Sequence, residues 1–164
     1  MRSAVLLPST ITTSVVIAIA RANANLPQEQ RFEQLLGGDV LYSPDTLRQA
    51  GSAVEGLVLA VAWHDENTYA QEAEHRWNGK INWRTAMSFD AAKVLTKALS
   101  RNATRETVLD ALKSSSMYLP GDETSGDELR FDKDGESTRN SRLVQVVRGG
   151  SPPLGSQWSF ERID

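Results

Sequence analysis

Residues 56–62, Gly-Leu-Val-Leu-Ala-Val-Ala, form the strongest strand pattern in the chain and decide the fold class. Nearly every position is apolar, which is typical of a strand in a parallel sheet that is covered on both faces. Toward the amino terminus, the short apolar runs 34–36 and 4–7 predict two further strands. Helices are predicted between these strands, over about residues 12–24 and from Pro44 onward, with Ser43 as the N-cap of the second helix. The order strand, helix, strand, helix, strand predicts an α/β fold with a parallel layer.

The amino terminus allows two interpretations. Residues 1–24 combine a basic start with apolar runs and small residues, as a secretory signal does. The polar residues 8–10 and 12–14 interrupt the apolar run, whereas the core of a signal is continuous. We therefore expect a strand, a turn and a helix, and the helix places Val15, Ala18 and Ile19 toward a sheet. No later stretch reaches the roughly 20 apolar residues of a membrane span.

The second half of the chain predicts three helices followed by two strands. Thr68 and Gln71 form a capping box for a helix over 69–77. The next helix, 83–100, carries an apolar stripe that we expect to face a core. The stripe consists of Ala86, Phe89, Ala92, Val94, Leu95 and Leu99.

Thr104 caps a predicted helix over 105–114. Residues 128–131 and 143–147 have strand patterns, and a turn at residues 132–135 followed by a polar connection joins them. The Pro-containing segment from Gly149 onward is expected to be a surface tail.

Composition excludes several classes of function. The 164 residues carry 18 Lys and Arg against 21 Asp and Glu, so a net charge of -3 gives no general attraction to nucleic acid. Cysteine is absent from the sequence, which excludes disulfides, thiolate metal sites and cysteine nucleophiles. The two histidines, His64 and His75, do not have zinc-site spacing. No set of nucleophile, base and orienting group is evident, so we expect neither an enzyme nor a metal or cofactor site.

Candidate ligand-binding residues follow the three predicted parallel strands at their carboxyl ends, where open α/β sheets bind ligands. They are Ser9 and Thr10 after the first strand, Asp39 and Tyr42 after the second, and Trp63 after the third. One acid, two hydroxyls and two aromatic rings suit a small zwitterion, because the carboxylate pairs with an ammonium group and the rings exclude water. The alternatives are a turn or cap role for Asp39 and a core role for the two aromatic residues.

Four segments carry a resemblance to a known family: Ala-Val-Leu-Leu-Pro-Ser-Thr at 4–10, Leu-Leu-Gly-Gly-Asp at 35–39, Ser-Ala-Val-Glu-Gly-Leu-Val at 52–58, and the segment 83–95. In this order they resemble the carboxyl-terminal half of the branched-chain amino-acid binding proteins, the type I periplasmic solute receptors of ABC transporters. The resemblance implies three-layer α/β lobes with parallel sheets, here incomplete. It implies that residues 1–66 form the later part of the second lobe, that residues 67–148 return to the first lobe through hinge-crossing strands, and that residues 149–164 are a tail.

The resemblance also implies a function. The chain is expected to be an extracytoplasmic substrate-binding component of an ABC transporter that binds an amino acid or a similar small polar solute and delivers it to membrane subunits. Asp39 would grip the ligand ammonium group and Thr10 would contact the ligand from the same lobe. The family's first half is absent from this sequence, so pairing with that half or with a second copy is expected. The alternative is an interaction or sensor module of the same fold that binds no ligand.

Overall fold

The computed structural model describes residues 4–6, 13–99, 103–114 and 116–164. The chain divides into two compact units. The first unit comprises residues 1–61 and 141–164, and the second comprises residues 62–140. The expected boundaries differ from this division, because residues 62–66 pack with the second unit, and residues 141–148 together with the expected tail pack with the first. The assignment of the units to particular lobes stays a prediction.

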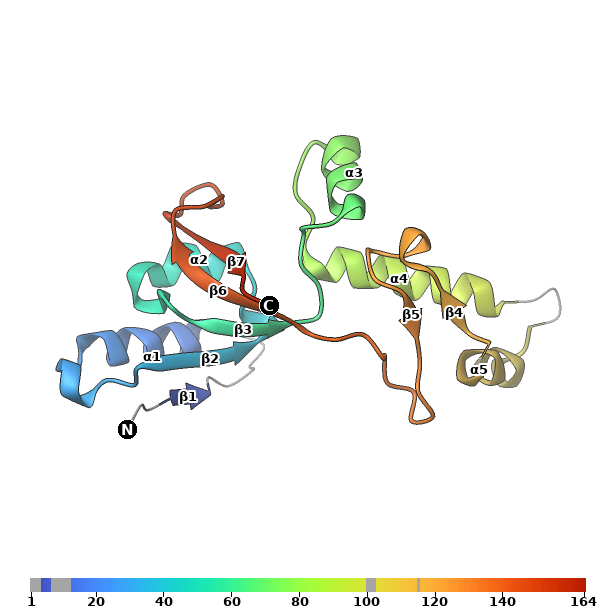
Figure 1. Ribbon diagram of the computed structural model, residues 1–164, viewed down its shortest axis with the longest axis horizontal. Helices are drawn as coiled ribbons and strands as arrows, with labels where there is room; N and C mark the ends of the chain where they lie inside the picture. The colour runs from blue at the N-terminus through green and yellow to red at the C-terminus, as the bar shows by residue number, and fades with distance from the viewer. Residues whose placement is uncertain (1–3, 7–12, 100–102, 115) are drawn as a thin grey trace. The chain divides into compact units, whose positions relative to one another are not determined.

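The first unit contains a five-stranded mixed sheet in the order β1-β2-β3-β6-β7 (Figure 1). Strands β1, β2 and β3 are parallel, and β6 and β7 continue the sheet antiparallel to β3 and to each other. The α/β class and the parallel layer are therefore confirmed. The strand bounds are Ala4–Leu6, Gln34–Gly38, Val58–Val61, Arg142–Arg148 and Trp158–Arg162.

The last strand, β7, lies where the sequence predicted a surface tail, so the expectation of a tail over residues 149–164 was wrong for this part. Trp158 and Phe160 alternate along β7 and pack against the core of the first unit. Gly149 and Gly150 adopt φ angles of 88° and 69°, which lets the chain reverse after β6. The strand pattern is only five residues long and follows a Pro-rich connection, which is why the sequence did not reveal it.

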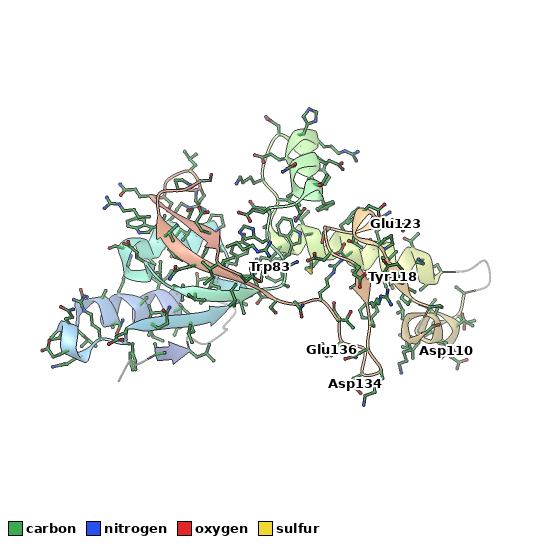
Figure 2. The ribbon with its side chains drawn as sticks, viewed as in Figure 1. Trp83, Asp110, Tyr118, Glu123, Asp134 and Glu136 are labelled. Atoms are coloured by element: carbon green, nitrogen blue, oxygen red, sulfur yellow. The ribbon has the colours of Figure 1, made fainter. Side chains whose placement is uncertain are left out.

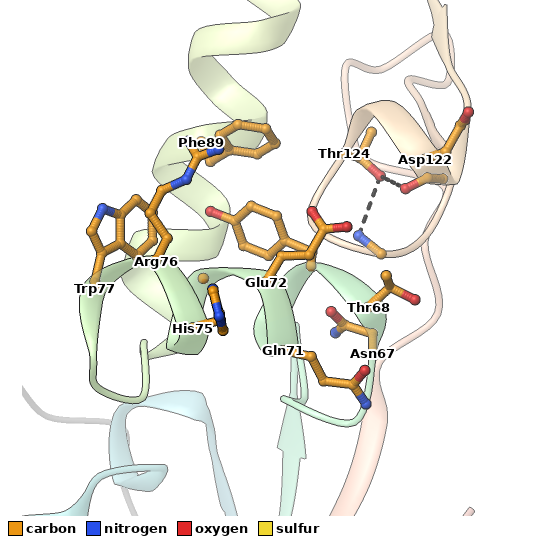
Figure 3. A pocket seen from close by; sticks show the side chains of 14 residues that line it. Asn67, Thr68, Gln71, Glu72, His75, Arg76, Trp77, Phe89, Asp122 and Thr124 are labelled. Carbon is orange, nitrogen blue, oxygen red and sulfur yellow. Dashed lines mark hydrogen bonds between the residues drawn. The ribbon is translucent and has the colours of Figure 1, made fainter.

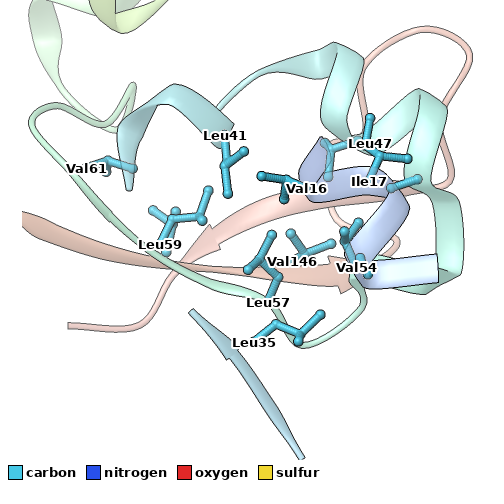
Figure 4. Close-up of a cluster of buried hydrophobic side chains, with 13 residues drawn as sticks. Val16, Ile17, Leu35, Leu41, Leu47, Val54, Leu57, Leu59, Val61 and Val146 are labelled. Carbon is cyan, nitrogen blue, oxygen red and sulfur yellow. The ribbon is translucent and has the colours of Figure 1, made fainter. Parts of the chain in front are cut away.

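The helices of the first unit lie over one face of this sheet. They are α1 (Thr13–Asn25), α2 (Pro44–Ala50) and three 3₁₀ turns, η1 (Gln28–Gln30), η2 (Asp39–Leu41) and η3 (Gly51–Val54). The Ser43 hydroxyl accepts a hydrogen bond from the Asp45 amide and Pro44 is the first residue of α2, as predicted. Their buried side chains form a single core with β2, β3 and β6 (Figure 4): Val16, Ile17, Leu35, Leu41, Leu47, Val54, Leu59, Val144 and Val146 are among its members.

The face of α1 that packs on the sheet differs from the predicted one. Val16, Ile17 and Ala20 are buried and the predicted Ile19 packs against the core while partly buried, whereas Val15 is 46% exposed and Ala18 is also exposed. Residues 15–20 are all apolar, so the pattern shows that the helix is buried without selecting which side is buried.

The second unit is built from three helices and a two-stranded antiparallel sheet. The helices are α3 (Thr68–Trp77), α4 (Trp83–Ala98) and α5 (Arg105–Lys113), and β4 (Tyr118–Leu119) pairs with β5 (Leu129–Arg130), with the turn η4 (Gly121–Glu123) between them. The two strand patterns that the sequence placed together thus belong to different sheets, because β6 pairs with β3. No helix in the described part of the chain is long and apolar enough to cross a membrane.

Two local features of the second unit correct the sequence-based expectations. Asn67, and not Thr68, caps α3: its side-chain oxygen accepts the Ala70 amide at 2.9 Å. On α4 the buried residues are Ala86, Asp90, Val94 and Ala98, whereas Leu95 and Leu99 are 48% and 59% exposed. The Thr104 cap of α5 is confirmed, with Thr107 completing a capping box.

Side-chain contacts on the surface of the second unit close a turn and join its two strands (Figure 2). The Asp132 carboxylate accepts hydrogen bonds from the amides of Asp134 and Glu136, both at 2.9 Å, and so closes the predicted turn after β5. The Arg130 guanidinium lies over the Tyr118 ring, 4.3 Å from its centroid. This contact joins β5 to β4 on their exposed side.

Candidate functional site

The carboxyl ends of β1, β2 and β3 lie at one edge of the sheet, because the three strands are parallel. This is the edge at which the sequence predicted ligand-binding residues. The segment that follows β1 contains Ser9 and Thr10, and both lie outside the described residues. Within the first unit, the structure therefore describes this edge through the residues that follow β2.

Asp39 follows β2 directly and begins the turn η2. Its carbonyl accepts the Tyr42 amide at 2.9 Å, so the backbone is fixed in the turn. The side chain is half-buried, and within the described residues its carboxylate has no hydrogen bond or ion pair. A half-buried carboxylate without a protein partner is available to a cationic group of a ligand.

Gly37 allows η2 to fold closely against the end of β2. A Cβ atom at this position would lie 2.6 Å from Leu41 Cδ1 and 2.9 Å from Leu59 Cδ2, and both leucines are fully buried. The absence of a side chain at Gly37 thus lets Leu41 enter the core and keeps Asp39 at the sheet edge. The glycine at position 37 of the Leu-Leu-Gly-Gly-Asp segment therefore has a steric reason, in addition to the resemblance of this segment to the family.

Tyr42 lies in the same unit as Asp39, with its ring on the core side. Its ring is 4.8 Å from that of Phe160, in an edge-to-face arrangement, and it packs against the buried cluster. This contact fixes the ring orientation at the end of η2. A wall role for Tyr42 toward a ligand stays a prediction.

Trp63 belongs to the second unit, where it is buried. Its indole Nε1 donates a hydrogen bond to the Ser125 carbonyl oxygen at 2.7 Å. The ring packs with Ala70 and Ala86 in a small apolar cluster. The structure thus gives Trp63 a packing role within its own unit, and its ligand role stays a prediction.

The second unit contains a cavity of about 1110 Å³ that the sequence did not suggest (Figure 3). It lies between α3, Phe89 of α4 and the loop that follows Pro120. Its lining mixes charged with aromatic side chains: Glu72, His75, Arg76, Trp77, Phe89 and Asp122. These residues are distant in sequence and share no motif, so only the fold brings them together.

Tyr69 lies at the wall of this cavity and stacks on Phe89, with ring centroids 4.7 Å apart. Its hydroxyl is buried and has no hydrogen-bond partner in the described part of the chain. Burial raises the pKa of the Tyr69 hydroxyl above its usual value, and the nearby Asp90 charge raises it further. The phenol therefore stays neutral to a higher pH than an exposed tyrosine does.

Asp90 fixes the loop that borders the cavity. Its carboxylate accepts hydrogen bonds from the Ser125 amide at 2.7 Å and the Ser125 hydroxyl at 2.6 Å. Arg139 forms a buried ion pair with the same carboxylate. A single acid in a predicted helix is normally exposed, so the sequence carries no sign of this role.

Comparison with solved structures identifies the fold. The chain superposes on a leucine-binding protein from Thermotoga maritima with a TM-score of 0.69 and 20% identity, over 96% of this chain and 43% of that one. An ABC transporter substrate-binding protein from Sphaerobacter thermophilus gives a TM-score of 0.68 and 14% identity, over 99% and 44%. A solute-binding protein of an ABC transporter from Rhodopseudomonas palustris, solved with 3,4-dihydroxybenzoic acid, gives 0.66 and 14%, over 99% and 45%.

These similarities show that the chain has the fold of part of a type I solute-binding protein, as the sequence predicted. The similar structures are solute-binding receptors and not enzymes. The chain spans less than half the length of each of these proteins. No family model matches the sequence, and neither does any curated protein.

Proposed function

We propose that the chain forms part of the substrate-binding component of an ABC transporter, and that it binds an amino acid or a similar small polar solute. In this proposal Asp39 pairs with the ligand ammonium group. Thr10 and Ser9 supply hydroxyl contacts, and Tyr42 and Trp63 contribute apolar walls. The assembly would deliver the solute to membrane subunits from the extracytoplasmic side.

The observation that carries the proposal is the position of Asp39. Its carboxylate is half-buried at the carboxyl edge of the parallel strands and has no partner among the described residues. A carboxylate that is partly removed from water and has no cation beside it is in an unfavourable environment. A cationic group of a ligand would therefore stabilise the Asp39 carboxylate. The fold supports the proposal because the similar structures are solute receptors.

The experiment is a titration of the ¹⁵N-labelled chain with a panel of amino acids and amino-acid amides, followed by NMR. This method detects binding even when Kd is about 1 mM, which corresponds to about -4 kcal/mol. We expect the amides of residues 37–42 to shift with at least one member of the panel. Asp39→Asn should weaken that binding by about ten- to a hundredfold, because a charged hydrogen bond contributes about 1.5–3 kcal/mol.

Glu29→Gln provides the matched control. Glu29 is an exposed acid of η1, which precedes β2, so it lies away from the carboxyl end of that strand. Its substitution removes the same charge and should leave binding unchanged. If both variants weaken binding equally, the effect is a general one of net charge and the role proposed for Asp39 is wrong.

A second candidate function is an interaction or sensor module that binds no solute. One similar protein holds 3,4-dihydroxybenzoic acid, a ligand without an ammonium group, so the fold alone does not select amino acids. Including that acid in the panel separates an amino-acid site from an aromatic-acid site. If no solute shifts any amide, the interaction module is favoured.

A further inference from the structure

The amino end of β6 lies at the same sheet edge as the candidate ligand-binding residues of the first unit. β6 runs antiparallel beside β3 (Figure 1), so the strand begins where β3 ends. The first residue of β6 is Arg142, and it pairs with Val61, the last residue of β3. A guanidinium group therefore originates at the edge where Asp39 follows β2.

Arg142 and Asp39 belong to one row of residues across the sheet. Gly38 of β2 pairs with Ala60 of β3. The next residues along these two strands, Asp39 and Val61, are therefore level with one another, and Val61 pairs in turn with Arg142. Two strand spacings of about 4.8 Å each place the backbones of Asp39 and Arg142 about 10 Å apart.

Both side chains start from the face of the sheet that carries α1 and α2, and both are half-buried. Val144, two residues after Arg142, is fully buried in the core beneath these helices, and residues two apart on a strand share a face. A Cβ atom at Gly37 would meet the same core. The glycine that follows it is extended, with φ -109° and ψ -176°, so Asp39 starts from the same face as Gly37.

The opposite charges of these two side chains are held apart. The Asp39 carboxylate makes no ion pair with any described residue, Arg142 included. Arg142 interacts with another group of the protein, but a guanidinium has five N–H donors and one such contact does not use them all. A half-buried acid and a half-buried guanidinium in one row match the two charges of a small zwitterion.

We infer that Arg142 binds a carboxylate of the ligand whose ammonium group Asp39 binds. The inference rests on the function proposed above and narrows its substrate class to solutes that carry both charges. A guanidinium suits this role because it holds a carboxylate through two parallel hydrogen bonds. The carboxylate has two sources, the α-carboxylate of any amino acid and the side chain of an acidic one, which the experiment separates.

The test measures Kd by NMR for two pairs of ligands. Leucine and leucinamide differ in the α-carboxylate, whereas glutamate and glutamine differ in the side-chain carboxylate. Each pair is titrated into the natural chain, Arg142→Gln, Arg142→Lys and the control Arg148→Gln. Arg148 is an exposed residue at the other end of β6, so its substitution removes the same charge from the opposite edge of the sheet. Circular dichroism confirms that each variant is folded, and Arg142→Lys carries the test if Arg142→Gln does not fold.

We expect the natural chain to bind the carboxylate member of at least one pair about tenfold or more tightly than the amide member, as a charged hydrogen bond would give. A preference within the leucine pair identifies the α-carboxylate as the bound group, and one within the glutamate pair identifies the side chain. Arg142→Gln should remove this preference. Arg142→Lys should keep part of it, because lysine retains the charge without the two parallel bonds. Arg148→Gln should leave it unchanged.

Two results would overturn the inference. Equal binding within both pairs by the natural chain would mean that no carboxylate is held at this edge. A preference that survives in Arg142→Gln, or that Arg148→Gln weakens as much, would mean that another group or the net charge causes it. In both cases the proposed function stands if Asp39→Asn still weakens binding. If no ligand shifts the amides of residues 37–42 in the natural chain, the proposed function fails and this inference fails with it.

Discussion

The Asp90 side chain makes the contacts that join α4 to the loop before β5 in the second unit. The carboxylate is buried on α4, bonds to both the amide and the hydroxyl of Ser125 and pairs with Arg139. Trp63 donates to the Ser125 carbonyl oxygen, so Ser125 is held from both sides. These bonds connect α4 to the loop before β5 in a unit whose apolar clusters are small.

Replacement of Asp90 by alanine is expected to destabilise the second unit by about 3–5 kcal/mol, because it removes the counter-ion of the buried Arg139 guanidinium, which then keeps only its hydrogen bonds to the carbonyl oxygens of Glu128 and Asp127. Asp110→Ala is the control, since Asp110 is an exposed acid of α5 and should change stability by less than about 0.5 kcal/mol. Urea unfolding followed by tryptophan fluorescence measures both. Equal effects of the two substitutions would contradict the role given to Asp90.

Tyr69 gives a prediction about pH. Its pKa is raised above the usual tyrosine value of 10.0, mainly by burial and then by the nearby Asp90 charge. The unfolded chain therefore ionises this phenol at a lower pH than the folded chain does. The stability that the neutral phenol contributes is complete below pH 10.0 and is lost as pH rises through the raised pKa of the folded state.

Tyr69→Phe should remove this part of the alkaline loss of stability. At neutral pH the substitution should be neutral or slightly stabilising, because the buried hydroxyl has no hydrogen-bond partner among the described residues. Unfolding free energies measured from neutral pH to about pH 11 test both statements. A clear loss of stability at neutral pH would show that the hydroxyl is bonded in solution.

At the level of elements, helix caps and helix faces were predicted unequally well. Ser43 and Thr104 were identified as caps because each stands immediately before a clear helical pattern. At α3 both Asn67 and Thr68 are good capping residues, and the sequence does not select between them. The buried side of α4 consists of Ala86, Asp90, Val94 and Ala98, so Leu95 and the C-cap Leu99 stay exposed.

The cap of α3 can be tested by two single substitutions. Asn67→Ala should cost about 1 kcal/mol, because it removes the bond to the Ala70 amide, whereas Thr68→Ala should cost only a few tenths. Asn67 also donates to the His64 carbonyl oxygen at 2.7 Å, which adds to its effect. Thermal unfolding of the two variants decides the matter, and a larger effect of Thr68→Ala would restore the capping box that the sequence predicted.

For the whole molecule, the sequence predicted the α/β class and the parallel arrangement of β1, β2 and β3 because their apolar runs are separated by helical patterns. It did not predict β4, whose two residues are too few to show a period. It also missed the pairing of β6 with β3, because that pairing joins residues more than 80 positions apart in the chain. Long-range pairing of this kind is set by the whole fold and leaves no local pattern.

The residues of the candidate site were likewise predictable only where the sequence pattern is local. Asp39 was predicted correctly to follow a parallel strand, because the Gly-Gly-Asp ending is local. The cavity beside α3 combines residues from three segments and has no local pattern.

The most direct test of the account compares an amino acid that binds with its analogue lacking the α-amino group, each titrated into the natural chain and into Asp39→Asn. If Asp39 holds the ammonium group, the natural chain should prefer the amino acid by about tenfold or more, and the variant should lose that preference. If the two ligands bind the natural chain equally, or if Asp39→Asn keeps the preference, Asp39 is not the anchor and the proposed receptor site is wrong.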